Sequence, residues 1–493
     1  MEINKSKQTE IKTENEPDRL LVEKVFSHKQ EHVFRWWNEL PENERKNLFN
    51  QLKDIDFALL QHLIKMHIKG NEPEQSNNKS TLKPPDIIPI PQNDSQRKYA
   101  SESKEIGVKA IKSGKTAVIT VAGGLGTRLG ANQPKGTLPI SPVTQKSIFQ
   151  LHAEKILATM KRYDTIIPWY IMTSGNNDKM TREFFKENHF FGFSTDTVYF
   201  FTQDTLPVLD LHGMLLMDSK STIVTSPNGH GGTFFALKEK GLVSNMNERG
   251  VRHIFYHQVD NVLINIADPV FLGYHIRKQA KMSPKVVMKT DPEEKVGIIG
   301  IRDGYLDTIE YSELSKAERH ARNPDGSLRF GMGNPAIYLL DVDFVEKVTN
   351  GKFPLPYHKA VKKVSCVDDN GKRVIPAENN AVKFEMFIFD ALKHAQKSII
   401  MEVAREEEFS PVKNVDGNDS PDTAIQHMTN QFGRWLSDAG INIPRDKNGN
   451  VRGKIEISPL YALDAEELKN KISRPNCTLR NKEIVFTGEL YLQ

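Results

Sequence analysis

A glycine-dense turn directly after an apolar strand constrains this chain more than any other feature. Residues 116–121, Thr-Ala-Val-Ile-Thr-Val, have the continuous apolar and β-branched character of a fully buried strand. Residues 122–130 follow as Ala-Gly-Gly-Leu-Gly-Thr-Arg-Leu-Gly, and residues 134–136 are Pro-Lys-Gly. Glycines at a strand end let backbone N–H groups approach phosphate oxygens, and Arg128 and Lys135 can neutralise phosphate charge. The segment therefore predicts a nucleotide-binding site.

The spacing of these glycines excludes two commoner motifs. A dinucleotide-binding fingerprint that starts at Gly124 would need its third glycine at Leu129. A Walker A loop needs Gly-Lys-Ser/Thr, whereas Ala131 and Asn132 follow Gly130. An oxidoreductase that binds a nicotinamide cofactor here is therefore disfavoured, and an ordinary strand-to-helix turn is the remaining structural alternative.

The composition of the chain is that of a globular protein, and its length of 493 residues predicts two or three domains. Among its 493 residues, 38% are hydrophobic, and the formal net charge of +4 is too small to predict a general nucleic-acid-binding surface. The two cysteines, Cys366 and Cys477, lie in no spacing typical of zinc or redox sites, and no apolar run reaches the length of a membrane span. We therefore expect a cytoplasmic protein without nucleic-acid or membrane partners; the oligomeric state is left open, with a monomer favoured.

The hydrophobic pattern predicts the order of domains along the chain. Residues 1–97 should form a helical N-terminal domain with a Pro-rich linker, because apolar residues recur at helical spacing from Leu20 to Ile68. In residues 98–405, short apolar strands alternate with longer helical patterns, which is typical of parallel strands joined by crossover helices. Residues 406–493 should form a small α+β domain. The predicted fold class is α/β, with a Rossmann-like core and a mixed, mainly parallel sheet.

The same patterns place individual elements within these domains. Strands are predicted at residues 116–121, 169–173, 198–201, 254–259, 285–288, 454–457 and 484–486, and helices at residues 147–162, 181–187 and 424–436.

The glycine-dense turn and the following Pro-Lys-Gly resemble the signature of the UDP-sugar pyrophosphorylases (UDPGP type 1), most closely the eukaryotic-type UDP-N-acetylglucosamine pyrophosphorylases. The resemblance continues through six further segments in the same order, at residue 203 and residues 226–232, 259–261, 310–313, 383–390 and 405–414. It implies a nucleotidyltransferase core that converts UTP and a sugar 1-phosphate, N-acetylglucosamine 1-phosphate above all, into UDP-sugar and pyrophosphate. Glucose or a broader set of hexose 1-phosphates, and a non-catalytic UDP-sugar sensor, are the alternatives.

A carboxylate beside the phosphate loop predicts a metal site. Ligands of open α/β sheets collect at the carboxyl ends of the strands, so Asp260 should lie next to the loop that follows Val121. A carboxylate is the hard oxygen ligand that Mg²⁺ prefers, although Asp260 and Asn261 could instead form a capping turn. The resemblance implies that Asp260 binds Mg²⁺, that Arg128 and Lys135 contact the β and γ phosphates of UTP, and that Lys413 contacts the sugar phosphate.

The resemblance also assigns residues to the base and to the sugar. The residues implied for the nucleotide are Ala122, Gly123, Gly124, Gln203, Gly229 and His230, and those for the sugar are Glu313, Asn334, Phe387 and Phe389. Two positions depart from the pattern of the N-acetylglucosamine enzymes: His230 replaces an asparagine, and Ile337 replaces a sugar-contacting asparagine that could form hydrogen bonds. Without the resemblance, the strand-like spacing of Phe387 and Phe389 would favour core packing.

Two histidines on one predicted strand suggest a metal site only weakly. His253 and His257 lie four residues apart, and the neighbouring sequence supplies no third ligand. We therefore expect both side chains to have packed or surface roles.

Overall fold

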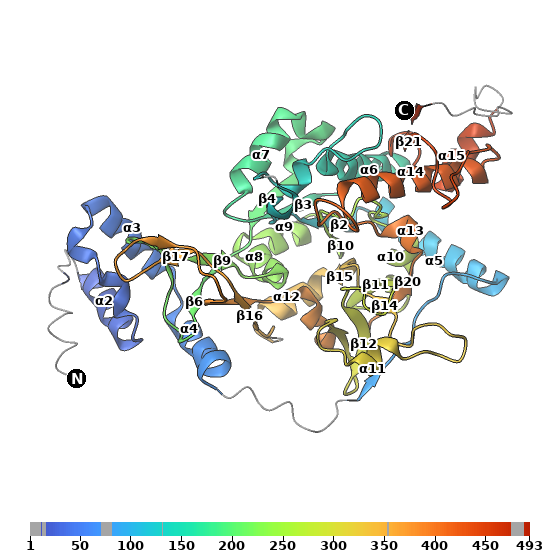
Figure 1. Cartoon of the computed structure of the whole chain (residues 1–493). Helices are drawn as coiled ribbons and strands as arrows, with labels where there is room; N and C mark the ends of the chain where they lie inside the picture. Colours follow the sequence, from blue (N-terminus) through green and yellow to red (C-terminus); the bar gives the residue numbers. More distant parts are fainter. Residues whose placement is uncertain (1–10, 12–15, 71–80, 131, 353, 475–487) are drawn as a thin grey trace. The chain divides into compact units, whose positions relative to one another are not determined.

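The computed structural model describes residues 11, 16–70, 81–130, 132–352, 354–474 and 488–493 (Figure 1). The chain divides into two compact units, each made of separate stretches. Unit 1 comprises Met1–Ser80, Asp204–Gly232 and Leu355–Ile388, and unit 2 comprises Thr81–Gln203, Thr233–Pro354 and Phe389–Gln493. Because these units follow contacts in space rather than order along the chain, the three sequential domains 1–97, 98–405 and 406–493 stay a prediction.

Unit 2 is built on a large mixed sheet. Its strands lie in the spatial order β1 (Leu82–Lys83), β12 (Ile298–Arg302), β14 (Met332–Gly333), β11 (Met282–Met288), β15 (Tyr338–Asp341), β10 (His253–Gln258), β2 (Thr116–Val121), β3 (Trp169–Thr173) and β4 (Val198–Thr202), while β13 (Tyr305–Ile309) pairs with β12 and β20 (Met401–Glu402) with β11. Strands β10, β2, β3 and β4 run parallel, whereas β15 is antiparallel to both β10 and β11. The predicted mixed α/β core is confirmed, and its parallel part carries the glycine-dense loop.

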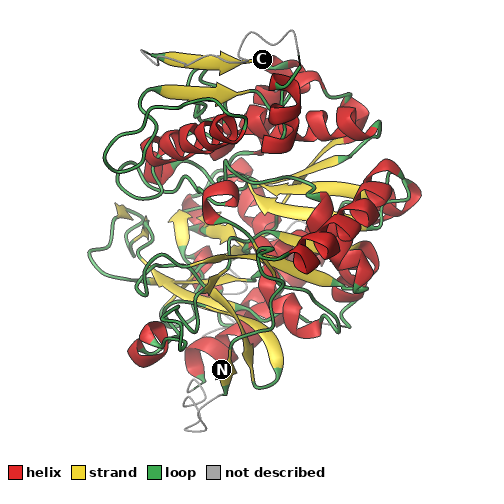
Figure 2. Cartoon of the chain, turned by 90° about the vertical axis from the view of Figure 1, so that its right-hand side faces the viewer, coloured by secondary structure: helices red, strands yellow, loops and turns green. Residues whose placement is uncertain are grey.

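Helices flank the strands of this sheet (Figure 2). The α-helices of unit 2 as far as residue 408 are α5 (Asp94–Lys112), α6 (Ile148–Tyr163), α7 (Asp178–Glu187), α8 (Thr233–Glu239), α9 (Leu242–Glu248), α10 (Pro269–Arg277), α11 (Lys316–His320), α12 (Val342–Thr349) and α13 (Arg405–Glu408). Strands β2 and β3 are buried at every position, as expected for parallel strands covered on both faces. Helix α6 begins where the Ser147 hydroxyl accepts a hydrogen bond from the Gln150 N–H, and it ends at Asp164 in the left-handed conformation.

The last part of unit 2 combines helices with one small sheet. It contains α14 (Pro421–Asp438), α15 (Ala465–Ile472) and the parallel pair β21 (Lys454–Ile457) and β22 (Glu489–Leu492). The strand predicted at residues 454–457 and the helix predicted at 424–436 are therefore confirmed. The strand predicted at 484–486 lies outside the described residues.

Unit 1 combines the N-terminal helices with strands from two later stretches. Its helices are α2 (Glu16–Ser27), α3 (Glu42–Lys53) and α4 (Phe57–Ile64), with short helices η1 (Glu31–Phe34), η2 (Trp37–Glu39) and η3 (Lys65–Lys69). Its strands are β5 (Thr205–Pro207), β6 (Leu209–Asp210), β7 (Met217–Ser219), β8 (Thr222–Ile223), β9 (Thr225–Pro227), β16 (His358–Lys362), β17 (Cys366–Val367), β18 (Arg373–Val374) and β19 (Ala381–Glu385). Figure 1 shows the blue helices beside these green and orange strands, and one hydrophobic core joins Leu52 and Phe57 to Leu209 and Phe384. Within the described parts of both units, we find no helix long and apolar enough to cross a bilayer.

Candidate functional site

The glycine-dense loop after β2 is held in place by polar side chains that follow β3. The Ser174 hydroxyl donates a hydrogen bond to the Gly123 carbonyl at 2.7 Å, and the Asn177 amide donates to the Ala122 carbonyl at 2.8 Å. Both side chains are buried, so these two hydrogen bonds hold the start of the loop, Ala122 and Gly123, against the segment that follows β3. The sequence analysis missed Ser174 and Asn177; their signal was a polar run at the carboxyl end of a parallel strand.

The second half of the loop folds back onto the first. The Lys135 N–H donates to the Gly124 carbonyl at 3.2 Å, which brings Lys135 beside the glycines. Gly136 is required next to it, because a Cβ atom there would lie 2.2 Å from the Phe149 ring. Arg128 lies on the short helix η4 (Thr127–Leu129) and its side chain is exposed.

Gln203 packs against the glycine loop, as expected if both contact one base. It follows β4, and its N–H donates to the Thr173 carbonyl at 2.9 Å. A Cβ atom on Gly123 would lie 3.3 Å from the Gln203 Nε2 atom, so the amide occupies the space beside the loop that glycine leaves. The carboxyl ends of β2 and β4 thus bring together the glycine loop and a side-chain amide able to pair with a pyrimidine edge.

Asp260 follows β10 and forms an ion pair with the lysine of the loop. The Lys135 Nζ atom lies 3.1 Å from the Asp260 Oδ2 atom, and the two side chains are only 18% and 17% exposed. The neighbouring Asn261 connects this loop to a distant segment, because its amide group donates to the Glu408 carbonyl at 2.7 Å and accepts from the Ser410 N–H at 2.9 Å. Asp260, the carboxylate predicted to bind metal, is therefore paired with the ammonium group of Lys135 at the phosphate loop.

Backbone pairing brings the segment with Lys413 alongside Asp260. The Val412 N–H donates to the Asp260 carbonyl at 2.9 Å, and Asn261 forms an antiparallel bridge with Pro411. The Lys413 Nζ atom lies 5.7 Å from the centre of the Phe409 ring. Asp260, Lys135 and the Lys413 segment are therefore neighbours, although they come from three distant parts of the sequence.

Three buried charged residues, Lys285, Asp268 and Glu408, form ion pairs close to the segments that carry Asp260 and Lys413. Lys285 on β11 is fully buried, and its Nζ atom lies 2.8 Å from Asp268 Oδ2 and 2.5 Å from Glu408 Oε1. The second Glu408 oxygen accepts from the Asn265 N–H at 3.1 Å. Burial raises the pKa of Glu408; burial alone would lower the pKa of Lys285, but the two carboxylates raise it. The only sequence signal for this triad was a lysine within an otherwise apolar strand.

The residues implied for sugar binding in unit 2 have intramolecular partners. The Asn334 amide donates to the Tyr338 hydroxyl at 2.6 Å and accepts from the Ala336 N–H at 3.0 Å. Arg302 donates to the Glu313 carboxylate at 2.7 Å. Ile337, which replaces the family's asparagine, is fully buried in the core.

Phe389 lies on the short helix η9 (Ile388–His394) and is buried. Strand β19 ends at Glu385, so neither Phe387 nor Phe389 lies on a strand as their spacing suggested. The strand stops at Glu385 and η9 begins at Ile388, so the alternation that a strand would have given these two rings is lost.

Unit 1 carries the second glycine loop, which is paired with the segment after β19. The Gly231 N–H donates to the Met386 carbonyl at 2.8 Å, and Gly229 has φ +85° in a space where a Cβ atom would lie 2.4 Å from that carbonyl oxygen. The His230 ring stacks on Phe387 with centroids 5.4 Å apart, and its Nδ1 atom accepts from the Ile388 N–H at 3.2 Å. Three residues predicted for nucleotide or sugar binding, Gly229, His230 and Phe387, are thus brought together within this unit.

Comparison with known proteins identifies the family. Residues 58–448 match the UDPGP family model, which is described as UTP–glucose-1-phosphate uridylyltransferase. The chain therefore belongs to the UDPGP family. As predicted, this UDPGP member is an enzyme, a nucleotidyltransferase of the UDP-sugar pyrophosphorylase type.

Relatives of this UDPGP member match it along most of its length. It is 35% identical over 478 residues to UDP-N-acetylglucosamine diphosphorylase 2 of Arabidopsis thaliana, covering 92% of this chain and 91% of that one. It is 36% identical over 457 residues to the UDP-N-acetylglucosamine pyrophosphorylase of Saccharomyces cerevisiae, with coverages of 89% and 94%. The crystal structure of the Trypanosoma brucei uridine diphosphate N-acetylglucosamine pyrophosphorylase in complex with inhibitor superposes with a TM-score of 0.78 at 27% identity, covering 98% of this chain and 99% of that one.

Proposed function

We propose that this UDPGP member is a Mg²⁺-dependent uridylyltransferase that forms UDP-N-acetylglucosamine and pyrophosphate from UTP and N-acetylglucosamine 1-phosphate. The observation that carries the proposal is the pairing of Lys135 with Asp260 at the mouth of a preorganised glycine loop, beside the segment that bears Lys413. The names of the relatives support the choice of sugar.

The reaction requires orientation and charge neutralisation rather than proton transfer. An ionised phosphate oxygen of the sugar 1-phosphate attacks the α-phosphorus of UTP, a new P–O bond forms, and the bond to the departing pyrophosphate breaks. We assign Arg128 and Lys135 to the β and γ phosphates and to the leaving pyrophosphate, and Lys413 to the sugar phosphate. Cations held close to the reacting phosphates stabilise the charge that develops on these oxygens.

Asp260 fits the role of the Mg²⁺ ligand. It is a partly buried carboxylate at the carboxyl end of a central strand, and it already attracts the ammonium group of Lys135. Mg²⁺ usually binds proteins through one or two carboxylates and completes its shell with water and substrate phosphates. When bound, the ion neutralises phosphate charge and aligns the reacting groups, and Lys135 is then available to the phosphates of UTP.

In unit 2, the uracil is assigned to the loop backbone at Ala122, Gly123 and Gly124 and to Gln203, and the sugar to Glu313, Asn334 and Phe389. In unit 1, Gly229 and His230 for the nucleotide and Phe387 for the sugar stay predictions from the sequence resemblance. Since Asn334 and Glu313 already bond to Tyr338 and Arg302, sugar binding has to compete with, or add to, these contacts.

A glucose 1-phosphate uridylyltransferase is the second candidate. It is favoured by the buried Ile337, which cannot form the hydrogen bond of the family's asparagine, and by the description of the family model. A substrate panel distinguishes the two candidate functions. Pyrophosphate release is measured with UTP, Mg²⁺ and each of N-acetylglucosamine, glucose and galactose 1-phosphate. We expect the highest kcat/KM with N-acetylglucosamine 1-phosphate.

A higher kcat/KM with glucose 1-phosphate would replace the proposed sugar. Binding of UDP-sugar without turnover of any hexose 1-phosphate would favour the non-catalytic sensor. The monomeric state and the cytoplasmic location stay predictions from the sequence, and light scattering of the purified protein tests the first of them.

A further inference from the structure

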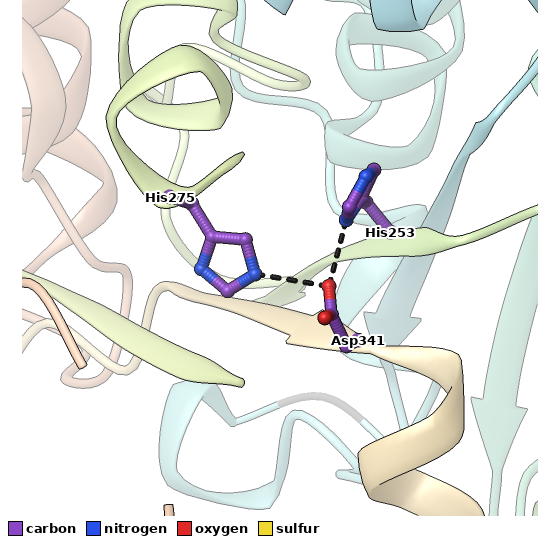
Figure 3. A group of neighbouring side chains, drawn as sticks. All are labelled: His253, His275 and Asp341. Carbon is purple, nitrogen blue, oxygen red and sulfur yellow. Dashed lines mark hydrogen bonds and ion pairs between the residues drawn. The ribbon is translucent and has the colours of Figure 1, made fainter. Parts of the chain in front are cut away.

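A second group of ligand-type side chains consists of His253, His275 and Asp341 (Figure 3). It lies at the start of β10, whereas Asp260 follows the end of that strand. His253 is the first residue of β10 and faces Asp341, the last residue of β15, in the antiparallel register. His275 comes from helix α10. Their ligand atoms all lie within 4.8 Å of one another, so three separate elements converge on one point.

The donor atoms in this cluster are spaced almost as a metal ion requires. The His253 Nδ1 atom lies 2.7 Å and the His275 Nε2 atom 3.1 Å from the same oxygen, Asp341 Oδ1. Ligand atoms in a tetrahedral zinc site, at roughly 2.0–2.1 Å from the metal, lie about 3.3 Å from one another. A small outward shift of the His253 ring would admit an ion. The side chains of His253 and Asp341 are 15% and 14% exposed, which leaves a path for entry and a position for water.

Outer contacts already orient two of the three ligands. The His275 Nδ1 atom lies 2.8 Å from the Ser283 hydroxyl, which directs the Nε2 atom of the same ring towards Asp341. The other Asp341 oxygen, Oδ2, is held by Lys281 at 2.9 Å, which leaves Oδ1 as the ligand atom. Histidine and carboxylate ligands of metal sites are oriented by outer hydrogen bonds of this kind.

The charge of the cluster permits a divalent cation despite the presence of Lys281. The Lys281 ammonium group lies 2.9 Å from Asp341 and 2.9 Å from Asp343. Two carboxylates and one ammonium leave one net negative charge, and neutral imidazoles add none. The lysine therefore reduces the attraction for a cation but does not cancel it.

We propose that His253, His275 and Asp341 form a binding site for a zinc-type divalent ion. Two imidazole nitrogens and one carboxylate suit Zn²⁺ and related transition metals, whereas Mg²⁺ prefers oxygen ligands alone. The strand rises about 3.3 Å per residue, so this site is roughly 20 Å from Asp260 and its ion does not touch the reacting phosphates. The ion fastens α10 to the ends of β10 and β15, and for His253 it replaces the packed or surface role expected from the sequence.

Amide variants separate a metal site from a hydrogen-bonded cluster. Asparagine places its amide where the Nδ1 atom of His253 lies, and glutamine places its amide where the Nε2 atom of His275 lies, so both can still donate to Asp341. Neither amide is a good zinc ligand. His320→Gln is the matched control, because His320 also contacts a carboxylate, Glu293, at 2.8 Å, but lies outside the cluster.

The full-length protein is stripped with a chelator, kept in excess Mg²⁺ to occupy oxygen sites, and titrated with Zn²⁺ while bound metal is measured. We expect the wild-type chain and His320→Gln to bind one more equivalent of Zn²⁺ than His253→Asn or His275→Gln, or to bind it at least ~10-fold more tightly. Zn²⁺ should raise the Tm of the first two proteins but not of the amide variants.

Co²⁺ added to the stripped wild-type protein provides a measurement that needs no variant. Visible absorption typical of four-coordinate Co²⁺ is expected, and Zn²⁺ should remove it. Equal zinc binding by the wild-type chain and both amide variants, or a wild-type protein without the Co²⁺ spectrum, would show that the cluster is a hydrogen-bond network only.

Discussion

At the scale of single residues, the ion pair between Lys135 and Asp260 links the phosphate loop to the metal ligand we propose. Each group neutralises the other while the site is without substrate, because both are largely shielded from water. UTP and Mg²⁺ offer each group a new partner of opposite charge. The pair can therefore separate on substrate binding without leaving either charge unpaired.

Replacing the Asp260 carboxylate tests this role directly. Asp260→Asn keeps the shape of the side chain but removes the negative charge, so we expect kcat to fall by about 10²-fold or more and the Mg²⁺ concentration for half-maximal activity to rise. Pyrophosphate release measured over a series of Mg²⁺ concentrations gives both quantities. Asp369→Asn, which changes an exposed carboxylate of unit 1, should leave both unchanged. An Asp260→Asn enzyme with the wild-type Mg²⁺ dependence would remove Asp260 from the metal site.

Lys413→Ala tests the cation assigned to the sugar phosphate. Its ammonium group contributes little packing beyond the Phe409 ring, so the far-UV circular dichroism and Tm should be close to those of the wild-type protein. Loss of one preorganised cation should lower kcat by about 10²-fold. Lys447→Ala, at an exposed turn, is the matched control. Unchanged turnover in Lys413→Ala would leave the residue without its assigned role.

At the scale of elements, a chain of polar side chains crosses three parallel strands beneath the phosphate loop. The Trp169 N–H on β3 donates to the Thr120 hydroxyl on β2 at 2.8 Å, and that hydroxyl lies 2.8 Å from the His257 Nε2 atom on β10. The His257 Nδ1 atom lies 3.0 Å from the Gln258 carbonyl oxygen, which can only accept, so in the neutral ring Nδ1 donates there and Nε2 accepts the Thr120 proton. Helix α6 adds His152, whose Nε2 atom lies 2.8 Å from the carbonyl of Val259, the residue before Asp260.

The lowered pKa values of His257 and His152 predict how the free energy of unfolding depends on pH. Burial lowers the pKa of His257 from 6.5 to about 4 and lowers the pKa of His152 well below its usual range. As the pH falls below 6.5, the unfolded chain binds protons that the folded chain does not, so the free energy of unfolding decreases until the pH reaches about 4. The slope contributed by each histidine is up to about 1.4 kcal/mol per pH unit.

His257→Gln should remove one of the two contributions. A glutamine oxygen can still accept from Thr120 but does not titrate, so the dependence of unfolding free energy on pH should become shallower by up to about 1.4 kcal/mol per unit between pH 6 and 4.5. Urea denaturation at a series of pH values measures this slope. His62→Gln, at an exposed position of α4, should retain the wild-type slope. An equal slope in both variants would mean that His257 titrates in the folded protein as it does in the unfolded chain.

Local patterns predicted the elements well but not the contacts between them. Strands β2, β3 and β21 occupy the predicted residues because apolar and β-branched runs determine them locally. The partners of His253 and of Lys285 could not be predicted from local patterns. The antiparallel register of β15 brings Asp341 to His253, whereas Lys285 meets Asp268 at the start of α10 and Glu408 on α13. The residues predicted for the site came from motif resemblance; the buried residues that hold them in place carry no local motif.

At the scale of the whole chain, unit 1 shows that the N-terminal helices share their hydrophobic core with later stretches of the chain. Apolar residues of α3 and α4, such as Leu52 and Phe57, pack against Leu215 and Ile223 from one later stretch and Val382 from another. The sequence suggested a helical domain followed by a linker, because helical periodicity reports which face of a helix is buried but not which segment covers it. In unit 1, the apolar faces of these helices are covered by short strands that follow more than 130 residues later in the sequence.

Removal of residues 1–70 distinguishes a shared core from an independent domain. The truncated chain keeps every residue assigned to catalysis, but it exposes the apolar side chains of the later stretches that the helices cover: Leu209, Leu215, Met217, Ile223, Val382 and Phe384. Each large apolar side chain left in water costs about 1.5–3 kcal/mol, so the truncated protein should aggregate or bind a hydrophobic dye strongly. Soluble yield after expression and dye fluorescence measure this, and co-expression of residues 1–70 as a separate chain should restore solubility. A soluble, monomeric truncated protein with a cooperative unfolding transition would instead support the independent domain expected from the sequence, because only a self-sufficient N-terminal domain can be removed without exposing the core of what remains.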